Sequence, residues 1–88
     1  MARQTPIGPE LMLRHLTVDE ALPMLEEYLH AAYLTGLTQV RIVHGKGTGT
    51  LRDMVVRRLK EHPLVTNYRP GGSGEGSAGV TVATLAED

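Results

Sequence analysis

The first third of the chain shows a strand-like pattern followed by a helical one. The apolar run at residues 11–13 suits a short first strand, and apolar side chains then recur at helical spacing over residues 18–32. Thr17 and Glu20 have the spacing of a capping box, which predicts a helix beginning just after Thr17, and Gly36 suits its end. Because Pro23 falls beyond the first turn of this helix, we expect a slight kink or a shifted start.

The rest of the chain predicts a second strand and helix and then two more strands. Residues 39–43 are rich in β-branched side chains and predict a short central strand. The next helix is predicted to be capped by Thr50, to end at His62-Pro63, and to bury an apolar stripe at Leu51, Val55 and Leu59. Residues 64–69 and 80–85 suit the third and final strands, joined by a glycine-rich hairpin or crossover loop.

The order β-α-β-α-β-β predicts the fold class α/β, more closely an α+β two-layer sandwich. Helices between the first three strands indicate crossover connections, which place both helices on one face of a four-stranded mixed sheet. We expect residues 10–86 to form the domain. Residues 1–9, which lack periodicity, are expected to form a linker or tail.

Composition narrows the class of protein. The 88 residues suffice for one small domain, and with no Trp or Phe and three Tyr the core must be aliphatic. Without Cys, a disulfide framework is excluded. No apolar run approaches the roughly 18 residues of a membrane span, and residues 1–9 are not a signal peptide. We therefore expect a cytoplasmic protein with no membrane partner.

Positive charge is concentrated in the middle of the chain, although the net charge is only −1. Residues 44–69 carry six basic side chains against two acidic ones, whereas the segments before and after them are net negative. A local basic face attracts phosphates even on a nearly neutral protein.

The strongest candidate for a functional site is the segment His44-Gly45-Lys46-Gly47-Thr48-Gly49. It joins a predicted strand to a predicted helix, where backbone N–H groups and the helix dipole favour an anion. Its glycines let a phosphate approach the backbone, Lys46 adds a positive charge, and His44 can act as general acid or base near neutral pH. The segment matches neither the Walker A loop nor the GxGxxG fingerprint. A tight structural turn is the alternative interpretation.

Five arginines are candidates to extend this site. Arg14 ends the first predicted strand, so we expect it to converge with His44 and Lys46 on one phosphate at the carboxyl edge of the sheet. Arg69 is predicted to bind a neighbouring phosphate or to bridge to an acid, and Arg52 to extend the basic track. Arg57 and Arg58 suit this track or a solvated helix face equally well.

The motifs together resemble the Smr (small MutS-related) domain family. They are Leu11-x-Leu13-Arg14, Leu16-Thr17-Val18-Asp19-Glu20-Ala21, the run from Val40 to Gly49, Leu51-Arg52, His62-Pro63-x-Val65, Arg69-Pro70-Gly71 and Gly79-Val80-Thr81-Val82. The resemblance covers about residues 10–86 and is greatest to the C-terminal domain of the second type of bacterial MutS protein. It implies a fold similar to the C-terminal domain of translation initiation factor three.

The resemblance also implies a function. It implies nucleic-acid binding through Gly45, Lys46, Gly47, Thr48, Gly49, Arg52 and Arg69, and nicking of DNA or cleavage of RNA. It implies a parent MutS-type protein with an N-terminal ATPase part, a role in recombination suppression, and ribosomal RNA as a further partner. A non-catalytic docking module for branched DNA or ribosomal RNA is the alternative, and a protein-interaction domain is a third.

Two positions depart from the family's first motif. Met12 stands where the family usually has Asp, and His15 stands where it usually has Gly. That acid is one candidate catalytic group, so we hypothesise that Glu10, on the same side of the strand as Met12, partly substitutes for it. The alternative is that Glu10 is a solvated residue at a strand end.

The remaining histidines give no sign of a metal site. No pair among His15, His30 and His62 has metal-ligand spacing, and we expect ordinary surface histidines. No cofactor is indicated within the domain, and a divalent metal is left open without support from the sequence.

Overall fold

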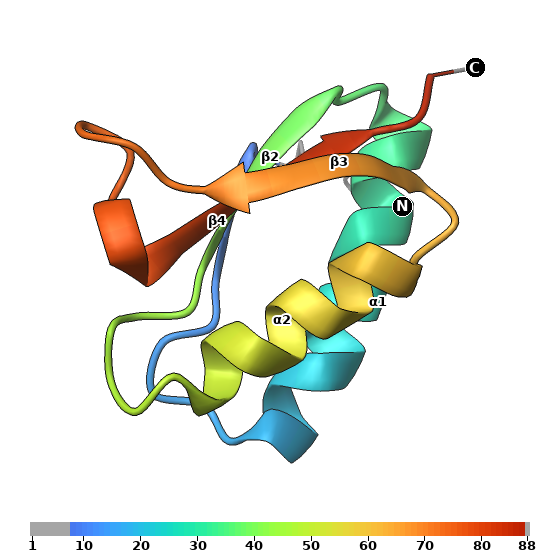
Figure 1. Ribbon diagram of the computed structural model, residues 1–88. Coiled ribbons are helices and arrows are strands. Elements are labelled where there is room, and N and C mark those ends of the chain that lie inside the picture. Colours follow the sequence, from blue (N-terminus) through green and yellow to red (C-terminus); the bar gives the residue numbers. More distant parts are fainter. Residues whose placement is uncertain (1–7, 88) are drawn as a thin grey trace.

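The computed structural model describes residues 8–87 and has the element order predicted from the sequence (Figure 1). The elements are β1 (Glu10–Met12), α1 (Val18–Thr35), β2 (Gln39–Val43), α2 (Thr50–Glu61), β3 (Val65–Pro70), the short 3-10 helix η1 (Ser77–Gly79) and β4 (Val80–Leu85). Residues 1–7 of the predicted linker lie outside the described residues. Gly8 and Pro9 belong to the domain, because their carbonyls accept hydrogen bonds from the Tyr28 hydroxyl (2.6 Å) and the Arg41 N–H (2.7 Å).

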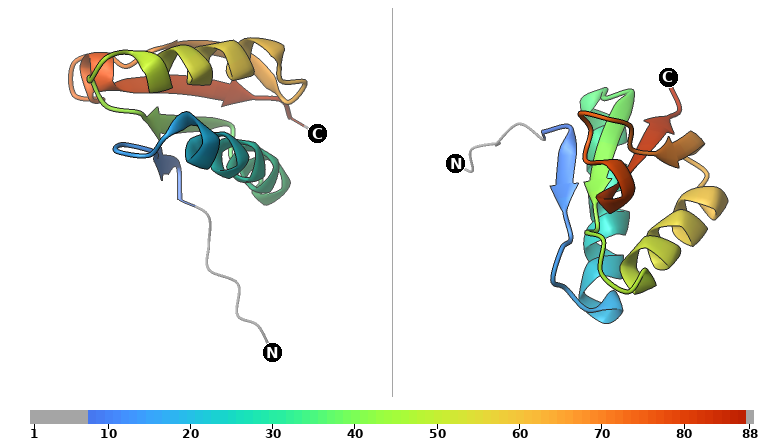
Figure 2. Two further views of the ribbon diagram at one scale, coloured as in Figure 1. Left: turned by 90° about the horizontal axis from the view of Figure 1, so that it is seen from below. Right: turned by 60° about the vertical axis from the view of Figure 1, so that its left-hand side comes forward.

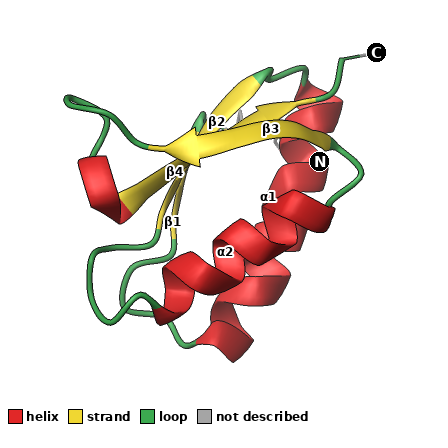
Figure 3. Ribbon diagram, viewed as in Figure 1, coloured by secondary structure: helices red, strands yellow, loops and turns green. Residues whose placement is uncertain are grey.

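The four strands form one mixed sheet in the order β1-β2-β4-β3 (Figure 3). β1 pairs with β2 in parallel, and β4 lies antiparallel between β2 and β3. β3 therefore runs parallel to β2 with one strand between them. The connection over residues 71–79 joins β3 to its antiparallel neighbour, so the hairpin alternative is the correct one.

Helix α1 begins where its capping box predicts. The Glu20 N–H donates to Thr17 Oγ1 (3.2 Å), and the Thr17 N–H donates to Glu20 Oε1 (2.9 Å). Pro23 lies inside the helix without shifting its start, because this cap satisfies the first turn independently. Gly36 ends the helix with a φ of 93°, the left-handed conformation that glycine adopts without strain.

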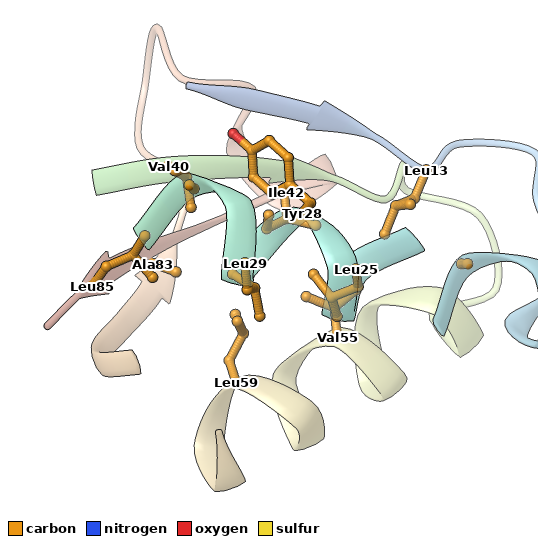
Figure 4. Close-up of a cluster of buried hydrophobic side chains, with 12 residues drawn as sticks. Leu13, Leu25, Tyr28, Leu29, Val40, Ile42, Val55, Leu59, Ala83 and Leu85 are labelled. Atoms are coloured by element: carbon orange, nitrogen blue, oxygen red, sulfur yellow. The ribbon is translucent and has the colours of Figure 1, made fainter. Parts of the chain in front are cut away.

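Both helices pack on the same face of the sheet. Leu25 and Leu29 of α1 meet Val55 and Leu59 of α2 (Figure 4), and each of these side chains is fully buried. The same cluster includes four buried sheet residues: Val40, Ile42, Ala83 and Leu85. Burying an aliphatic side chain contributes roughly 1.5–3 kcal/mol, so this aliphatic cluster fixes the two layers. It also fixes the positions of the strand ends from which the loops of the candidate site extend.

The opposite face of the sheet carries a second, smaller apolar cluster. It consists of Val43, Val80 and Val82, all at most 9% exposed. The β3–β4 connection folds back against it, since a Cβ at Gly71 would lie 3.2 Å from the Val80 Cβ. This connection is therefore packed against the sheet at the end where β2 also finishes.

Candidate functional site

Two loops meet at the carboxyl edge of the sheet. Because β1 and β2 are parallel neighbours, the segments that follow them, 13–17 and 44–49, leave the same edge and run side by side to the helices (Figures 1 and 2). Together they line a hollow of about 530 Å³. It is bounded by residues 14–18 on one side and by residues 44–52 on the other. We call it the loop hollow.

Arg14 lies directly on the backbone of Gly45. Gly45 has a φ of 84°, and a Cβ there would lie 3.1 Å from the Arg14 Cγ and 3.2 Å from its Cδ. Glycine is required for the dihedral and leaves room for the arginine side chain. The predicted convergence of Arg14 with the glycine-rich segment is thus present in the structure.

The β3–β4 connection supports the same loop from the opposite side. The Gly79 carbonyl accepts hydrogen bonds from the N–H groups of both His44 and Gly45, each at 3.0 Å. A Cβ at Gly79 would lie 3.4 Å from the Lys46 Cγ, so the lysine stem passes close to this backbone. Lys46 and Arg14 are therefore held on the two sides of Gly45.

His44 lines the loop hollow but is almost fully buried. It is 4% exposed, its Nδ1 lies 2.9 Å from the Gly45 carbonyl oxygen, and its Nε2 lies 2.9 Å from Thr81 Oγ1. A carbonyl only accepts, so Nδ1 carries the proton, and in the neutral ring Nε2 accepts from the Thr81 hydroxyl.

The electrostatic surroundings of His44 favour this neutral form. Burial lowers the pKa of His44 below its ordinary value, the Gly45 carbonyl partly opposes this, and the nearby Arg52 charge adds to the lowering. Both ring nitrogens are engaged, so the imidazole joins the loop to β4.

The cations of the loop hollow are unpaired. Arg14 and Lys46 are exposed, and neither side chain has a hydrogen bond or ion pair with any residue in the range 8–87. Arg52 is also exposed and makes only a long contact, 3.9 Å, with the neighbouring Asp53. Positive charge without partners gathers here, where an anion can reach it.

The amino end of α2 adds backbone donors to this charge. Gly49, not Thr50 as predicted, is the N-cap, and it has no side-chain oxygen to accept from the first turn. The Thr48 hydroxyl lies 2.9 Å from the Thr50 hydroxyl. A helix end without a side-chain cap favours an anion through its N–H groups and its dipole.

Arg69 does not join the loop hollow. Its guanidinium donates to both carboxylate oxygens of Glu75, at 2.7 and 3.0 Å, and Glu75 also accepts from the Gly72 N–H at 2.8 Å. The Arg69 hydrogen bonds lower the pKa of Glu75 to about 2. Of the two interpretations of Arg69, the structure favours the bridge to an acid.

Glu10, Arg57 and Arg58 also lie away from the loop hollow. Glu10 contacts Arg41 at 3.5 Å, so the structure does not bring this carboxylate to the candidate site. Arg57 is exposed on α2. Arg58 contacts Glu26 of α1 and joins the two helices.

Sequence reasoning missed the residues that hold the loop in place. Thr81 is 3% exposed, and its only signal was a polar side chain on the same strand face as Ala83 and Leu85. The expectation of a surface histidine was wrong for His62, whose side chain is 9% exposed and contacts Glu26 at 3.3 Å. Its burial arises from the packing of α1 against α2, which no local pattern encodes.

Within residues 8–87, no group of three His, Asp or Glu side chains is placed to hold a metal ion. Neither described helix has both the length and the apolar character needed to cross a membrane.

Comparison with known proteins relates this chain to one domain family. The Smr domain family matches residues 11–86. The chain is 54% identical over 80 residues to "Endonuclease MutS2" of Pelotomaculum thermopropionicum, which covers 91% of this chain and 10% of that protein. It is 49% identical over 87 residues to "Endonuclease MutS2" of Symbiobacterium thermophilum, covering 99% and 11%. The chain thus spans about a tenth of the length of these curated relatives.

Solved structures agree with the sequence matches. The crystal structure of the Smr domain of Thermus thermophilus MutS2 has a TM-score of 0.86 and 40% identity, covering 90% of this chain and 99% of that one. YdaL, a stand-alone small MutS-related protein from Escherichia coli, also has a TM-score of 0.86, with 28% identity over 90% of this chain and 65% of its own. The predicted fold is confirmed, and the chain belongs to the Smr domain family.

Proposed function

We propose that this domain binds the phosphodiester backbone of nucleic acid at the loop hollow. The observation that carries the proposal is a pair of exposed cations, Arg14 and Lys46, which have no partner within residues 8–87 and lie along the glycine-rich loop that leads to the amino end of α2. Binding of this kind rests on phosphate contacts, so it depends steeply on salt and only weakly on base sequence. The natural partners are DNA and, for the same chemical reason, ribosomal RNA.

We further propose that the bound phosphodiester is hydrolysed, which produces a nick. Two relatives of this chain bear the name endonuclease. In this reaction a water oxygen bonds to phosphorus and releases a proton to solvent, while the bond from phosphorus to the leaving sugar oxygen breaks and that oxygen takes up a proton from solvent. Arg14, Lys46 and the loop N–H groups stabilise the charge that develops on the phosphoryl oxygens. His44 supports the loop in this scheme, since neither ring nitrogen is free.

One observation favours a second candidate, a docking module without catalysis. No carboxylate is among the described residues that line the loop hollow. Met12, on β1, stands where the family usually has an acid, and Glu10 pairs with Arg41 instead of reaching the hollow. In either version the domain acts in the cytoplasm as the C-terminal part of a MutS-type ATPase concerned with recombination. The share of the relatives that this chain spans supports such a parent protein.

The test is a nicking and binding assay on supercoiled plasmid and on structured RNA. It compares the unmodified domain with Lys46→Ala and with Lys60→Ala, which removes an equal charge from an exposed position on α2 outside the loop hollow. We expect Lys46→Ala to weaken binding about tenfold or more, beyond the share of one surface charge, and Lys60→Ala to have little effect.

The outcomes separate the candidate functions. Nicking that is lost in Lys46→Ala establishes hydrolysis at the loop hollow. Binding without nicking leaves the docking module. If no polyanion binds at low salt, nucleic-acid function is excluded and a protein partner remains.

A further inference from the structure

One residue of the loop hollow has a backbone conformation that does not suit its side chain. His15 has a φ of 74°, in the left-handed region that a side chain disfavours. The Leu16 N–H donates to the Leu13 carbonyl at 3.1 Å, so His15 occupies the third position of a four-residue turn. Glycine or asparagine meets a positive φ there with the least strain. The chain nevertheless has an exposed imidazole at this point of the loop hollow.

The loop hollow has walls of two chemical kinds. Arg14 and Lys46 form a cationic part, whereas Leu16, Val18 and Leu51 form an apolar part of the same lining. A phosphate group alone satisfies the cations and leaves most of about 530 Å³ and the apolar wall without contact. A nucleotide joins an anion to a flat, largely apolar base, and it matches both parts.

We propose, resting on the function proposed above, that the loop hollow binds one unpaired nucleotide. Its phosphate contacts Arg14 and Lys46, and its base packs on the His15 ring and the apolar wall. Bases of a duplex are stacked and paired inside the helix, so they do not reach a wall beside their own phosphate. Bases of single strands and loops are open to stacking on aromatic rings, histidine included. The substrate class is therefore single-stranded or locally unpaired nucleic acid.

The strain at His15 supplies a test with two opposite effects. Fluorescent single-stranded DNA and RNA oligonucleotides, and duplexes of the same length, are titrated with the unmodified domain, His15→Gly and His15→Asn. We expect a preference for the single strands, and a loss of about fivefold or more of that affinity in both variants because the ring is absent. His15→Gly relieves the backbone strain, so its Tm rises by roughly 4 °C or more. Weaker binding by a more stable protein is not the behaviour of a residue that only shapes the turn.

Two further variants, His30→Asn and Lys46→Ala, separate a failure of this inference from a failure of the proposed function. His30→Asn changes an exposed histidine of α1 outside the loop hollow, and it leaves both affinities unaltered. Equal affinity for single strand and duplex, or an unchanged preference in His15→Gly, overturns the inference. If Lys46→Ala weakens the binding of both single strands and duplexes while His15→Gly alters neither affinity, only this inference fails. If neither variant changes binding, the proposed function fails as well.

Discussion

Two regions of the domain differ in whether their basic side chains contact a carboxylate. At the contact between the helices, which we call the helix seam and define as Glu26, Arg58 and His62, both basic side chains contact the Glu26 carboxylate. In the loop hollow, Arg14 and Lys46 have none among residues 8–87. The helix seam uses charge to join two elements of the fold. The loop hollow leaves its charge available, which is what a site for an external anion requires.

Hydrogen bonding within the helix seam shifts the pKa values of both Glu26 and Arg58. The Arg58 hydrogen bond lowers the pKa of Glu26, and burial only partly opposes this. The same hydrogen bond raises the pKa of Arg58. Charge at the helix seam is thus already stabilised within the fold, whereas charge in the loop hollow gains a partner only from a ligand. Substitutions in the helix seam should therefore change the stability of the fold, and substitutions in the loop hollow should change nucleic-acid binding.

The largest expected effect comes from Gly45→Ala, which affects both properties. The left-handed φ of 84° costs an alanine about 1–2 kcal/mol of folding free energy. The Cβ added at position 45 would lie 3.1 Å from the Arg14 Cγ, so the Arg14 side chain must move away from the loop. We therefore expect nucleic-acid affinity to fall about tenfold or more. Urea unfolding and fluorescence anisotropy measure the two effects.

Gly36→Ala is the matched control for this prediction. Its φ of 93° imposes a similar backbone cost, but no atom lies within 4 Å of the added Cβ. We expect comparable destabilisation with unchanged affinity. An equal loss of binding in the two variants would contradict the placement of Arg14 in the site.

The next effect is expected from Glu26→Gln, which removes the shared carboxylate of the helix seam. Arg58 loses its ionic partner and His62 loses its contact with a carboxylate, and we expect about 1 kcal/mol of destabilisation with normal nucleic-acid binding. The lowered pKa of Glu26 means that its stabilisation is present above its ordinary value of 4.5 and is lost as the pH falls through its folded pKa. The difference between the variant and the unmodified domain should therefore disappear in strong acid. Glu27→Gln, at an exposed neighbouring position, is the control, and a similar loss there would contradict the pairing.

The smallest effect is expected from protonation of His44. Its lowered pKa means that the unfolded chain binds a proton more readily, so the contribution is full above the ordinary value of 6.5 and declines as the pH falls through it. We expect the unmodified domain to lose less than about 1 kcal/mol between pH 7.5 and 5.5 by this route. His44→Gln, which does not titrate, should show a flatter profile in thermal unfolding across this interval. Identical profiles would show that His44 is not held in its neutral form.

Local signals predicted much of this molecule. The capping box of Thr17 and Glu20 fixed the start of α1 because its hydrogen bonds involve residues three apart. The parallel pairing of β1 with β2 made it possible to expect Arg14 beside the glycine-rich loop. These inferences needed only short-range geometry and one rule about parallel strands.

Long-range partners could not be predicted in the same way. The burial of His62 depends on how α1 and α2 pack, and the engagement of His44 by Thr81 depends on β4 lying next to β2. The sequence left two interpretations of Arg69 open, and the folding of the β3–β4 connection decides between them. In each case the deciding contact joins residues whose proximity follows from the assembled tertiary structure.

The position of β4 has a consequence for the order of events during folding. This strand comes last along the chain but lies between β2 and β3, so neither has a neighbour on that side until it arrives. Pairing of β4 with β2, which is far away along the chain, is slow relative to helix formation. During synthesis, Gly79 and Thr81 emerge after the loop that they hold. The geometry that we propose to bind an anion is therefore assembled only after β4 has joined the sheet, and a partly made chain has the basic residues without that geometry.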